Sequence, residues 1–414
     1  MAGVVNRIRQ TQKLWRTEGA SGVVYRVRAR AANRLMPAGS RRLVVTRDDF
    51  LRTAEIARNG WVLPGPENWQ SNEPLKVAWV CTPPAPGSGG HTTMFRIVAA
   101  LEKAGHTCVV YLQDQHGWDI EQHRETIEKW WPSVRAEIRD LADGVEDCHV
   151  IFATGWGTAY AVLGSNAKGV RCYLVQDFEP AFTPAGSEYL LAEATYRFGF
   201  YGITAGKWLS NLLTSNYGMD TDHFDFGCDL DVYGLDRSVG VDRDRVGVAY
   251  YCRPSTPRRA HELAIFALDL FASAHPEVEI HLYGEAIGPP PFRTTHHGLL
   301  SPPELGALYN RCIAGLVLSA TNVSLVPLEM LAAGCIPVVN DAAQNRIVLD
   351  NPNVEYAPAT PYDLADALSR LVERSAAERA AAVQSASISV KSTSWESAGS
   401  KVESTLRRLV AERI

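Results

Sequence analysis

The sequence lacks any apolar run of the ~18–20 residues that a helix needs to cross a bilayer. Its basic N-terminus also has no apolar core of about 7–15 residues, the mark of a signal peptide. The eight cysteines form no CxxC pair, and Cys81, Cys108, Cys172 and Cys252 lie in apolar, strand-like runs. We therefore expect a cytoplasmic protein with reduced, buried thiols and no zinc site.

Acidic residues are scarce at the N-terminus. Residues 1–58 hold 13 Lys and Arg against 4 Asp and Glu, a net charge of +9. Since the whole chain has a net charge of −5, the remainder carries −14. This split predicts a basic arm with a partner of its own.

Two interpretations fit this arm. It interleaves Arg with apolar and aromatic residues such as Trp15 and Tyr25, as an interfacial helix needs for an anionic membrane surface. On this interpretation the protein is peripheral at the inner face of the plasma membrane. The alternative is an arm that packs on the body of the protein with its Arg residues solvated. No nucleic-acid recognition module follows and the rest of the chain is acidic, so nucleic acid is not an expected partner.

Beyond the arm, strand-like and helix-like segments alternate, with one break near residue 240. This alternation predicts an α/β fold with two Rossmann-like, doubly wound parallel-sheet domains that face each other across a cleft. At 414 residues the chain is long enough for two such domains. The predicted parts are an N-terminal arm and linker (1–74), a first domain (75–240), a second domain (241–390) and a C-terminal helix (391–414).

The most informative stretch is 314–341, which predicts a strand over 315–319, a polar loop over 321–324, a short helix from near Pro327 to Gly334 and a strand over 336–339. Glu329 is the odd residue in that helix, because a buried, unpaired carboxylate costs several kcal/mol. Hydrogen bonds from a ribose diol would justify its position. Alternatively, Glu329 caps a neighbouring loop or pairs with an Arg.

A glycine-rich segment follows the first predicted strand. Gly89 and Gly90 precede a helix predicted from about Thr92, a pattern that suits a phosphate cradle. The segment is not GxGxxG and no acidic residue follows at dinucleotide spacing, so NAD is disfavoured. The alternative is a tight strand–helix turn. His91 either contacts a ligand here or helps to cap the helix.

Polar side chains end two further strands. Gln176, Asp177 and Glu179 follow the apolar run 170–175 and suit sugar binding or acid/base chemistry. Alternatively, these side chains are solvated in a loop or cap a helix near 187–197. Arg253 and Arg258 follow a strand that ends at 251–252, where two guanidinium groups near a helix start would neutralise a diphosphate. Their alternative is a solvated basic loop.

The segment NVSLVPLEMLAAGCIPVVND resembles the nucleotide-sugar signature of GT-B glycosyltransferases, specifically the retaining group called family 4. That signature carries two Glu residues. Glu329 matches the second, and Thr321 stands where the first would fall. Together with QDFEP at 176–180, this departure resembles the WsaF-like rhamnosyltransferase branch, which builds bacterial surface glycans. Arg253 and Arg258 match the spacing of the family's Arg and Lys pair. The resemblance covers roughly 75–410.

The resemblance implies a retaining glycosyltransferase of cell-envelope polysaccharide biosynthesis that moves a sugar, rhamnose from dTDP-rhamnose, onto a glycan or lipid-linked glycan acceptor. It implies no metal and no other cofactor, an acceptor-binding first domain, a donor-binding second domain and a C-terminal helix that crosses back to the first. The expected catalytic residues are Asp177, Glu179, Arg253 and Arg258; the donor site adds Gly89, Gly90, Thr321, Ser324, Leu325 and Glu329, and the acceptor site has His91 and Gln176.

Two other functions stay open from the sequence. One is a GT-B nucleotide-sugar 2-epimerase, which needs no acceptor. The other is a non-catalytic, glycan-binding scaffold, made conceivable by Thr321 in place of Glu.

Overall fold

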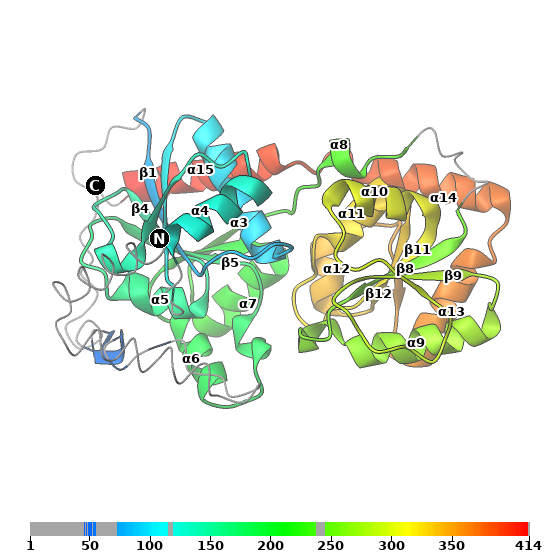
Figure 1. Ribbon diagram of the computed structural model, residues 1–414. Coiled ribbons are helices and arrows are strands. Elements are labelled where there is room, and N and C mark those ends of the chain that lie inside the picture. The colour runs from blue at the N-terminus through cyan, green and yellow to red at the C-terminus, as the bar shows by residue number, and fades with distance from the viewer. Residues whose placement is uncertain are drawn as a thin grey trace, which may run out of the picture.

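The computed structural model describes residues 73–114, 119–236 and 245–412, with isolated residues between 45 and 54. The predicted arm over 1–74 and the predicted boundary at 240–241 therefore lie almost entirely outside the described residues. Two α/β domains lie side by side, each built around its own parallel sheet (Figure 1). The predicted fold class is confirmed.

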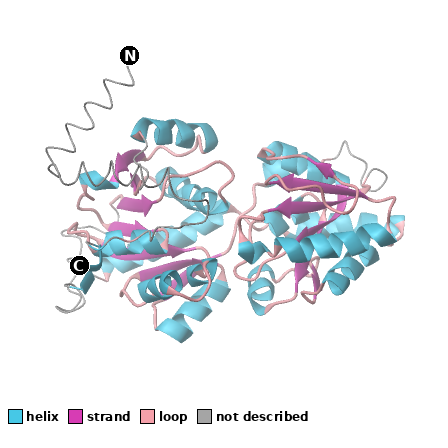
Figure 2. Cartoon of the chain, turned by 60° about the horizontal axis from the view of Figure 1, so that its bottom comes forward, coloured by secondary structure: helices cyan, strands magenta, loops and turns pink. Residues whose placement is uncertain are grey.

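The first domain contains a seven-stranded sheet in the order β3-β2-β1-β4-β5-β6-β7, and every neighbouring pair is parallel. Its central strands are buried along their whole length, as expected for a sheet covered by helices on both faces (Figure 2). The strands are β1 (Lys76–Cys81), β2 (Thr107–Leu112), β3 (Glu137–Asp140), β4 (Val150–Ala153), β5 (Val170–Val175), β6 (Tyr201–Ala205) and β7 (Thr221–Phe224). The helices are α3 (Gly89–Lys103), α4 (Ile120–Trp130), α5 (Trp156–Leu163), α6 (Ser187–Thr195) and α7 (Lys207–Tyr217), with short 3-10 turns η1 (Leu141–Asp143) and η2 (Glu179–Phe182). Helix α8 (Leu230–Tyr233) follows at the junction and packs on the second domain.

The second domain repeats this plan with a six-stranded parallel sheet in the order β10-β9-β8-β11-β12-β13. Helices α9 and α13 pack together on one face, and α10, α11 and α14 cover the other (Figure 1). The strands are β8 (Gly247–Cys252), β9 (Glu279–Gly284), β10 (Thr295–His296), β11 (Cys312–Val317), β12 (Ile336–Asn340) and β13 (Glu355–Ala357). The helices are the short 3-10 turn η3 (Pro257–Arg259), α9 (His261–Ala274), α10 (Pro302–Arg311), α11 (Val326–Ala332), α12 (Ala343–Leu349), α13 (Pro361–Val372) and α14 (Ala376–Ser389). The chain then ends with α15 (Trp395–Ala411).

Strand order identifies where a ligand would bind. In each sheet the chain moves outward from a first central strand and then restarts on its other side, between β1 and β4 and between β8 and β11. Loops that leave the two strands at such a switch point diverge and open a crevice at the carboxyl edge. The relevant loops are the glycine-rich segment after β1, the arginine-rich segment after β8 and the polar segment after β11.

The last helix returns to the first domain. Figure 1 shows α15 lying along that domain, where it packs against α3. Asp222 of β7 accepts hydrogen bonds of 2.9 Å from Thr405 Oγ1 and Arg408 Nη2 on α15. The C-terminal helix is therefore bound to the first domain, although it follows the second domain in the sequence.

Several local expectations can be compared with the structure. The capping box of Ser301 and Glu304 is present at the start of α10, and all eight cysteines are free and buried, as predicted. The predicted start of α3 at Thr92 was wrong, because Ser88 caps the helix and places Gly89 and Gly90 in its first turn. The predicted strand over 315–319 instead runs from Cys312 to Val317. In the described part of the chain, no helix combines the length and apolar character of a membrane span.

The crossing of α15 over α3 predicts the effect of a larger residue at Gly399. A Cβ atom there would lie 2.3 Å from Ala100 Cβ, so the helices would have to separate. We expect Gly399→Val to lower the free energy of unfolding by about 1–3 kcal/mol, measured by urea denaturation. Ser400→Ala, on the exposed side of the same helix, is the control. Equal stability of the Gly399→Val variant and wild type would contradict this packing.

Candidate functional site

Arg253 follows the last residue of β8 at the carboxyl edge of the second sheet. Its Nη1 donates a 2.8 Å hydrogen bond to the Tyr251 hydroxyl, and its Nε lies 3.1 Å from Glu285 Oε1, beyond the end of β9. Glu285 also accepts hydrogen bonds from the backbone N–H and hydroxyl of Ser255 in the same loop. Glu285 thus holds both the Arg253 side chain and the loop that carries it.

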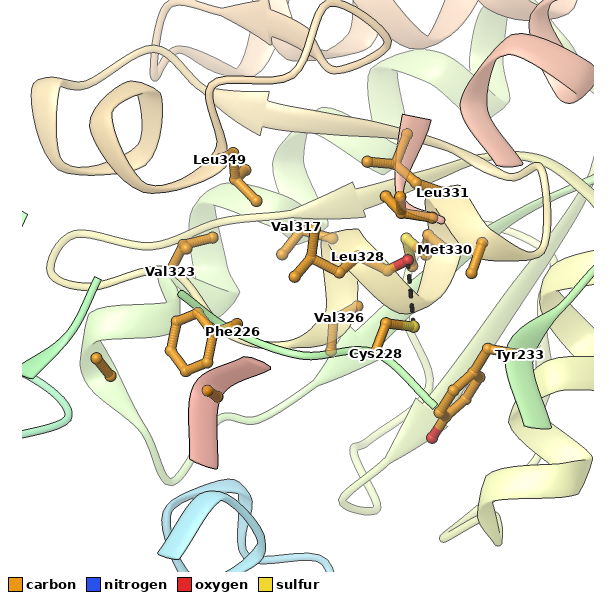
Figure 3. Packing of buried hydrophobic residues seen from close by; sticks show 14 of the residues in the cluster. Phe226, Cys228, Tyr233, Val317, Val323, Val326, Leu328, Met330, Leu331 and Leu349 are labelled. Carbon is orange, nitrogen blue, oxygen red and sulfur yellow. Dashed lines mark hydrogen bonds between the residues drawn. The ribbon is translucent and has the colours of Figure 1, made fainter. Parts of the chain in front are cut away.

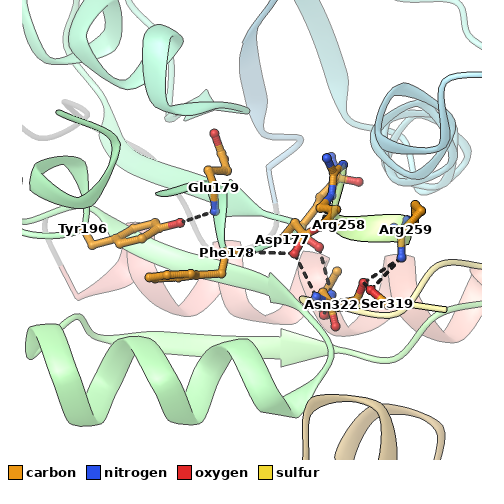
Figure 4. Close-up of polar contacts among 10 residues, drawn as sticks. Asp177, Phe178, Glu179, Tyr196, Arg258, Arg259, Ser319 and Asn322 are labelled. Atoms are coloured by element: carbon orange, nitrogen blue, oxygen red, sulfur yellow. Dashed lines mark hydrogen bonds and ion pairs between the residues drawn. The ribbon is translucent and has the colours of Figure 1, made fainter. Parts of the chain in front are cut away.

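Arg258 reaches the first domain. Its Nε donates a 2.9 Å hydrogen bond to Asp177 Oδ2, two residues past the end of β5. Its guanidinium carbon lies 3.9 Å from the centre of the Phe182 ring, also in the first domain. Figure 4 shows the Asp177–Arg258 pair between elements of the two domains. The structure therefore joins two predicted site residues that are far apart in the sequence.

Arg259 is the third guanidinium of this loop. Its Nη1 donates hydrogen bonds to Ser319 Oγ at 2.8 Å and to the Asn322 carbonyl oxygen at 3.1 Å (Figure 4). Burial lowers the pKa of Arg259 to about 10; the charge of Asp177 opposes this shift, while those of Arg258 and Arg253 add to it. Positive charge is therefore concentrated at the end of β8.

The loop after β11 lies against this arginine loop and enters the first domain. The Asn322 backbone N–H donates to Asp177 Oδ1 at 2.9 Å, and its Nδ2 donates at 2.9 Å to the carbonyl oxygens of Gln176 and Ala205. The hydroxyl of Thr321 is buried and has no hydrogen-bond partner among the described residues; the same holds for Asn322 Oδ1. Two buried oxygens are thus available to a polar ligand at this boundary.

Glu329 lies on α11, where its neighbours Leu328 and Met330 belong to the apolar packing that Figure 3 shows together with Cys228. Burial raises the pKa of the Glu329 carboxyl to about 7, and a hydrogen bond from Tyr233 offsets only part of that shift. Cys228, at the junction between the domains, donates its thiol to the Leu328 carbonyl oxygen at 3.8 Å. The charges of Asp229 and of Arg96 on α3 also act on this carboxyl group, which therefore lies near the first domain.

A row of tyrosines connects Glu329 with Arg253. Tyr251, which accepts from Arg253, stacks on Tyr283 with ring centres 4.9 Å apart. The hydroxyls of Tyr283 and Tyr309 are 2.6 Å apart, and the Tyr309 ring stacks on that of Tyr233, the partner of Glu329. Arg253, predicted to bind the diphosphate, and Glu329, predicted to bind the ribose, thus lie at opposite ends of this row of tyrosines.

The glycine-rich segment lies on the opposite side. A Cβ atom on Gly90 would lie 3.7 Å from Gln176 Nε2, and a Cβ atom on Gly87 would lie 3.3 Å from Leu299 of the second domain. The ring of His91 is held by Ser88 Oγ at 2.8 Å and by the Thr82 carbonyl oxygen at 3.0 Å, and burial lowers its pKa. The His91 ring thus braces both ends of the glycine-rich segment.

Glu179 is turned into the first domain. Its Oε2 accepts a 2.6 Å hydrogen bond from the backbone N–H of Trp156, at the start of α5, and its Oε1 accepts one of 2.9 Å from the Tyr173 hydroxyl. Burial raises the pKa of Glu179 to about 7. The carboxyl group caps α5 rather than the helix near 187–197 that the sequence suggested.

The structure gathers Asp177, Gln176, Arg253, Arg258 and Thr321 at facing loops. Ser324 and Leu325 lead from the same polar loop into α11. Sequence reasoning missed Glu285 and Asn322 and left Arg259 out of the site; only the position of Arg259 beside Arg258 could have signalled its role.

A cavity of about 410 Å³ opens directly after Glu285 and is lined by 286–290 and by Phe292, Arg293, Thr294 and His296. No cluster of three or more His, Cys, Asp or Glu side chains within the described ranges could hold a metal ion.

A protein-family model and a known protein match parts of this chain. Residues 247–369 match the family model of the WsaF C-terminal domain, a match that lies within the second domain. The O-antigen biosynthesis protein RfbC of Myxococcus xanthus is 35% identical over 256 residues, which are 60% of this chain and 20% of RfbC. The chain thus spans about a fifth of the length of that relative.

Solved structures share the fold of about four fifths of this chain. Anabaena HepE, solved in complex with UDP and glucose, has a TM-score of 0.62 at 15% identity, over 81% of this chain and 100% of HepE. TarM of S. aureus has a TM-score of 0.66 at 10% identity, over 82% of this chain and 100% of TarM. The protein has the GT-B fold of glycosyltransferases and is WsaF-like in its second domain.

The buried position of Glu179 predicts a pH-dependent stability. Because its folded-state pKa of about 7 lies above the ordinary 4.5, its protonated form stabilises the folded protein below pH 4.5, and this contribution is lost as the pH rises through 7. Between pH 4.5 and pH 8 we expect the unfolding free energy of wild type to fall relative to that of Glu179→Gln by up to about 3 kcal/mol. Urea denaturation across this range measures the difference. Glu128→Gln, at an exposed position of α4, should keep the wild-type pH dependence; a Glu179→Gln variant that also kept it would refute the assignment.

Proposed function

We propose that this protein is a glycosyltransferase that moves a sugar from a nucleotide-diphosphate donor onto a glycan or lipid-linked glycan acceptor of the bacterial cell surface. The observation that carries the proposal is the convergence of Arg253, Arg258 and Arg259 at the switch point of the second sheet, facing the first domain. Concentrated cationic charge at such an edge suits a diphosphate.

Each donor group has a matching feature in this proposal. Arg253 and Arg258 bind the diphosphate and stabilise the charge that develops on it as the sugar leaves. Glu329 accepts hydrogen bonds from the ribose hydroxyls, which offset the cost of its burial. The Thr321 hydroxyl, unpartnered among described residues, contacts the transferred sugar, with Ser324 and Leu325 on the same loop.

The first domain completes the site in this proposal. Gly89 and Gly90, in the first turn of α3, allow close approach of the donor, while His91 and Gln176 line the acceptor side. This assignment draws on HepE, which was solved with UDP and glucose, and on TarM, which was solved with UDP and α-GlcNAc-glycerol.

The identity of the donor and the stereochemistry at the anomeric carbon are further parts of the proposal. We take the donor as dTDP-rhamnose and the reaction as retaining, on the strength of the WsaF C-terminal domain match and the relation to the O-antigen biosynthesis protein RfbC. The catalytic role of Glu179 stays a prediction, since both carboxylate oxygens are engaged within the first domain. Metal independence, a cytoplasmic location and attachment of 1–58 to a membrane likewise remain proposals.

Removal of Arg253 tests the electrostatic role. We expect Arg253→Ala to lower kcat by ~100-fold or more, because preorganised positive charge at a leaving group contributes on this scale. Arg370→Ala removes an exposed, ion-paired guanidinium on α13 and should leave turnover unchanged. Steady-state kinetics with dTDP-rhamnose, the proposed donor, give the comparison. Wild-type turnover in Arg253→Ala would remove Arg253 from the site.

A donor panel tests the activity itself. Purified protein is incubated with dTDP-rhamnose, UDP-glucose or GDP-mannose, with and without a lipid-linked glycan, and release of nucleoside diphosphate is measured. We expect release from dTDP-rhamnose that increases with acceptor. Conversion of a donor to its 2-epimer without acceptor would identify an epimerase. Absence of both reaction and binding with every donor would favour the scaffold.

A further inference from the structure

We propose that Asp177 is a positioning residue that acts across the domain boundary: its carboxylate holds Arg258 and the 319–322 loop, so that Arg258 is set for the donor diphosphate only when the domains are closed. This inference rests on the proposed function and specifies how its site is assembled. It assigns Asp177 a role other than acid/base catalysis or direct sugar binding.

The first observation is the use of both carboxylate oxygens. Oδ1 of Asp177 accepts from the backbone N–H groups of Phe178 and Asn322, and Oδ2 accepts from Arg258 Nε. One of these donors lies in the first domain and two lie in the second. Asp177 is 7% exposed, so these bonds are shielded from water and strengthened accordingly. Its acceptor capacity is directed to protein groups.

The second observation is the orientation of Arg258. Asp177 holds the guanidinium by Nε and the Phe182 ring covers one face at 3.9 Å. The terminal nitrogens Nη1 and Nη2 have no hydrogen-bond partner among the described residues, and 24% of the side chain is exposed. The Nε edge of the guanidinium, which Asp177 holds, faces the first domain. The two terminal amino groups are therefore left to bind an anion.

The third observation is a set of further hydrogen bonds between the 319–322 loop, the first domain and Arg258. The Asn322 side chain donates to the carbonyl oxygen of Gln176, the residue after β5, and to that of Ala205, the last residue of β6. The backbone N–H of Ala320 donates to the Arg258 carbonyl oxygen at 2.9 Å, which couples the arginine loop to the same polar loop. Opening the domains would break these bonds together and release Arg258 from its orienting carboxylate.

A double-mutant cycle tests whether Asp177 acts through Arg258. We expect Asp177→Ala and Arg258→Ala each to lower kcat/KM for the donor by about 10- to 100-fold, since charge-assisted hydrogen bonds are among the strong ones. The double variant should be no worse than Arg258→Ala by more than about 3-fold, because the two changes remove one arrangement. Losses that multiply would show that Asp177 acts independently and would overturn the proposal.

Asp177→Asn covers the case in which the alanine variant fails to fold. The amide keeps the size of the side chain but has a single acceptor oxygen, so Arg258 or Asn322 loses its partner. We expect a loss close to that of Asp177→Ala. Wild-type kcat/KM in Asp177→Asn would contradict the proposal.

Domain closure gives a readout that does not depend on activity. Small-angle X-ray scattering of the unliganded full chain should show a larger radius of gyration for Asp177→Ala and Asp177→Asn than for wild type. The matched control is Asp222→Ala, which removes an Asp–Arg hydrogen bond of the same 2.9 Å length, to Arg408, away from the cleft. A radius unchanged in both Asp177 variants would overturn the closure role.

Calorimetry with dTDP and UDP separates this proposal from the function on which it rests. Wild type that binds neither nucleotide would refute the proposed donor site, while scattering would still decide whether Asp177 closes the cleft. Binding by wild type that is weakened at least tenfold in both Asp177 variants, but not in Asp222→Ala, is the expected result. Equal binding by the Asp177 variants and wild type would contradict the positioning of Arg258.

Discussion

Concentrated positive charge at the end of β8 is the constraint on which the arrangement of the cleft depends. Three guanidinium groups occupy one short loop, and each is compensated differently: Arg253 by Glu285, Arg258 by Asp177, and Arg259 by the neutral oxygens of Ser319 and Asn322. Burial of cations without full compensation is costly, as the lowered pKa of Arg259 indicates. An anionic ligand at this edge would supply the missing compensation.

This charge also explains why the two domains meet as they do. The only way for Arg258 to gain the Asp177 carboxylate is for the loop after β8 to reach the end of β5 in the other domain. The polar loop after β11 follows, because Asn322 finds its acceptors there too. The same strand order in both sheets sets the two switch points at the carboxyl edges that carry these loops. In this structure the contact between the domains and the compensation of the Arg258 charge therefore depend on the same loops.

Two carboxyl groups show that a perturbed pKa does not by itself identify a catalytic residue. Burial raises the pKa of both Glu179 and Glu329 to about 7. Both carboxylate oxygens of Glu179 accept hydrogen bonds from its own domain, and one of them caps the start of α5. Glu329 is hydrogen-bonded by Tyr233 and lies near the charges of Asp229 and of Arg96 on α3 in the first domain. Geometry separates a structural carboxyl from a candidate binding carboxyl where the pKa cannot.

The sequence by itself determined the two alternating α/β domains and the candidate residues Arg253, Arg258 and Glu329, because strand and helix periodicity and residue type at strand ends are local properties. Helix caps such as Ser301 with Glu304 were predictable for the same reason. Only the tertiary structure decided the partners. Asp177 and Arg258 are 81 residues apart, and Asn322 is 145 residues from Asp177. Such pairs form only when two separately folded domains pack together, and no local pattern encodes which loop then faces which.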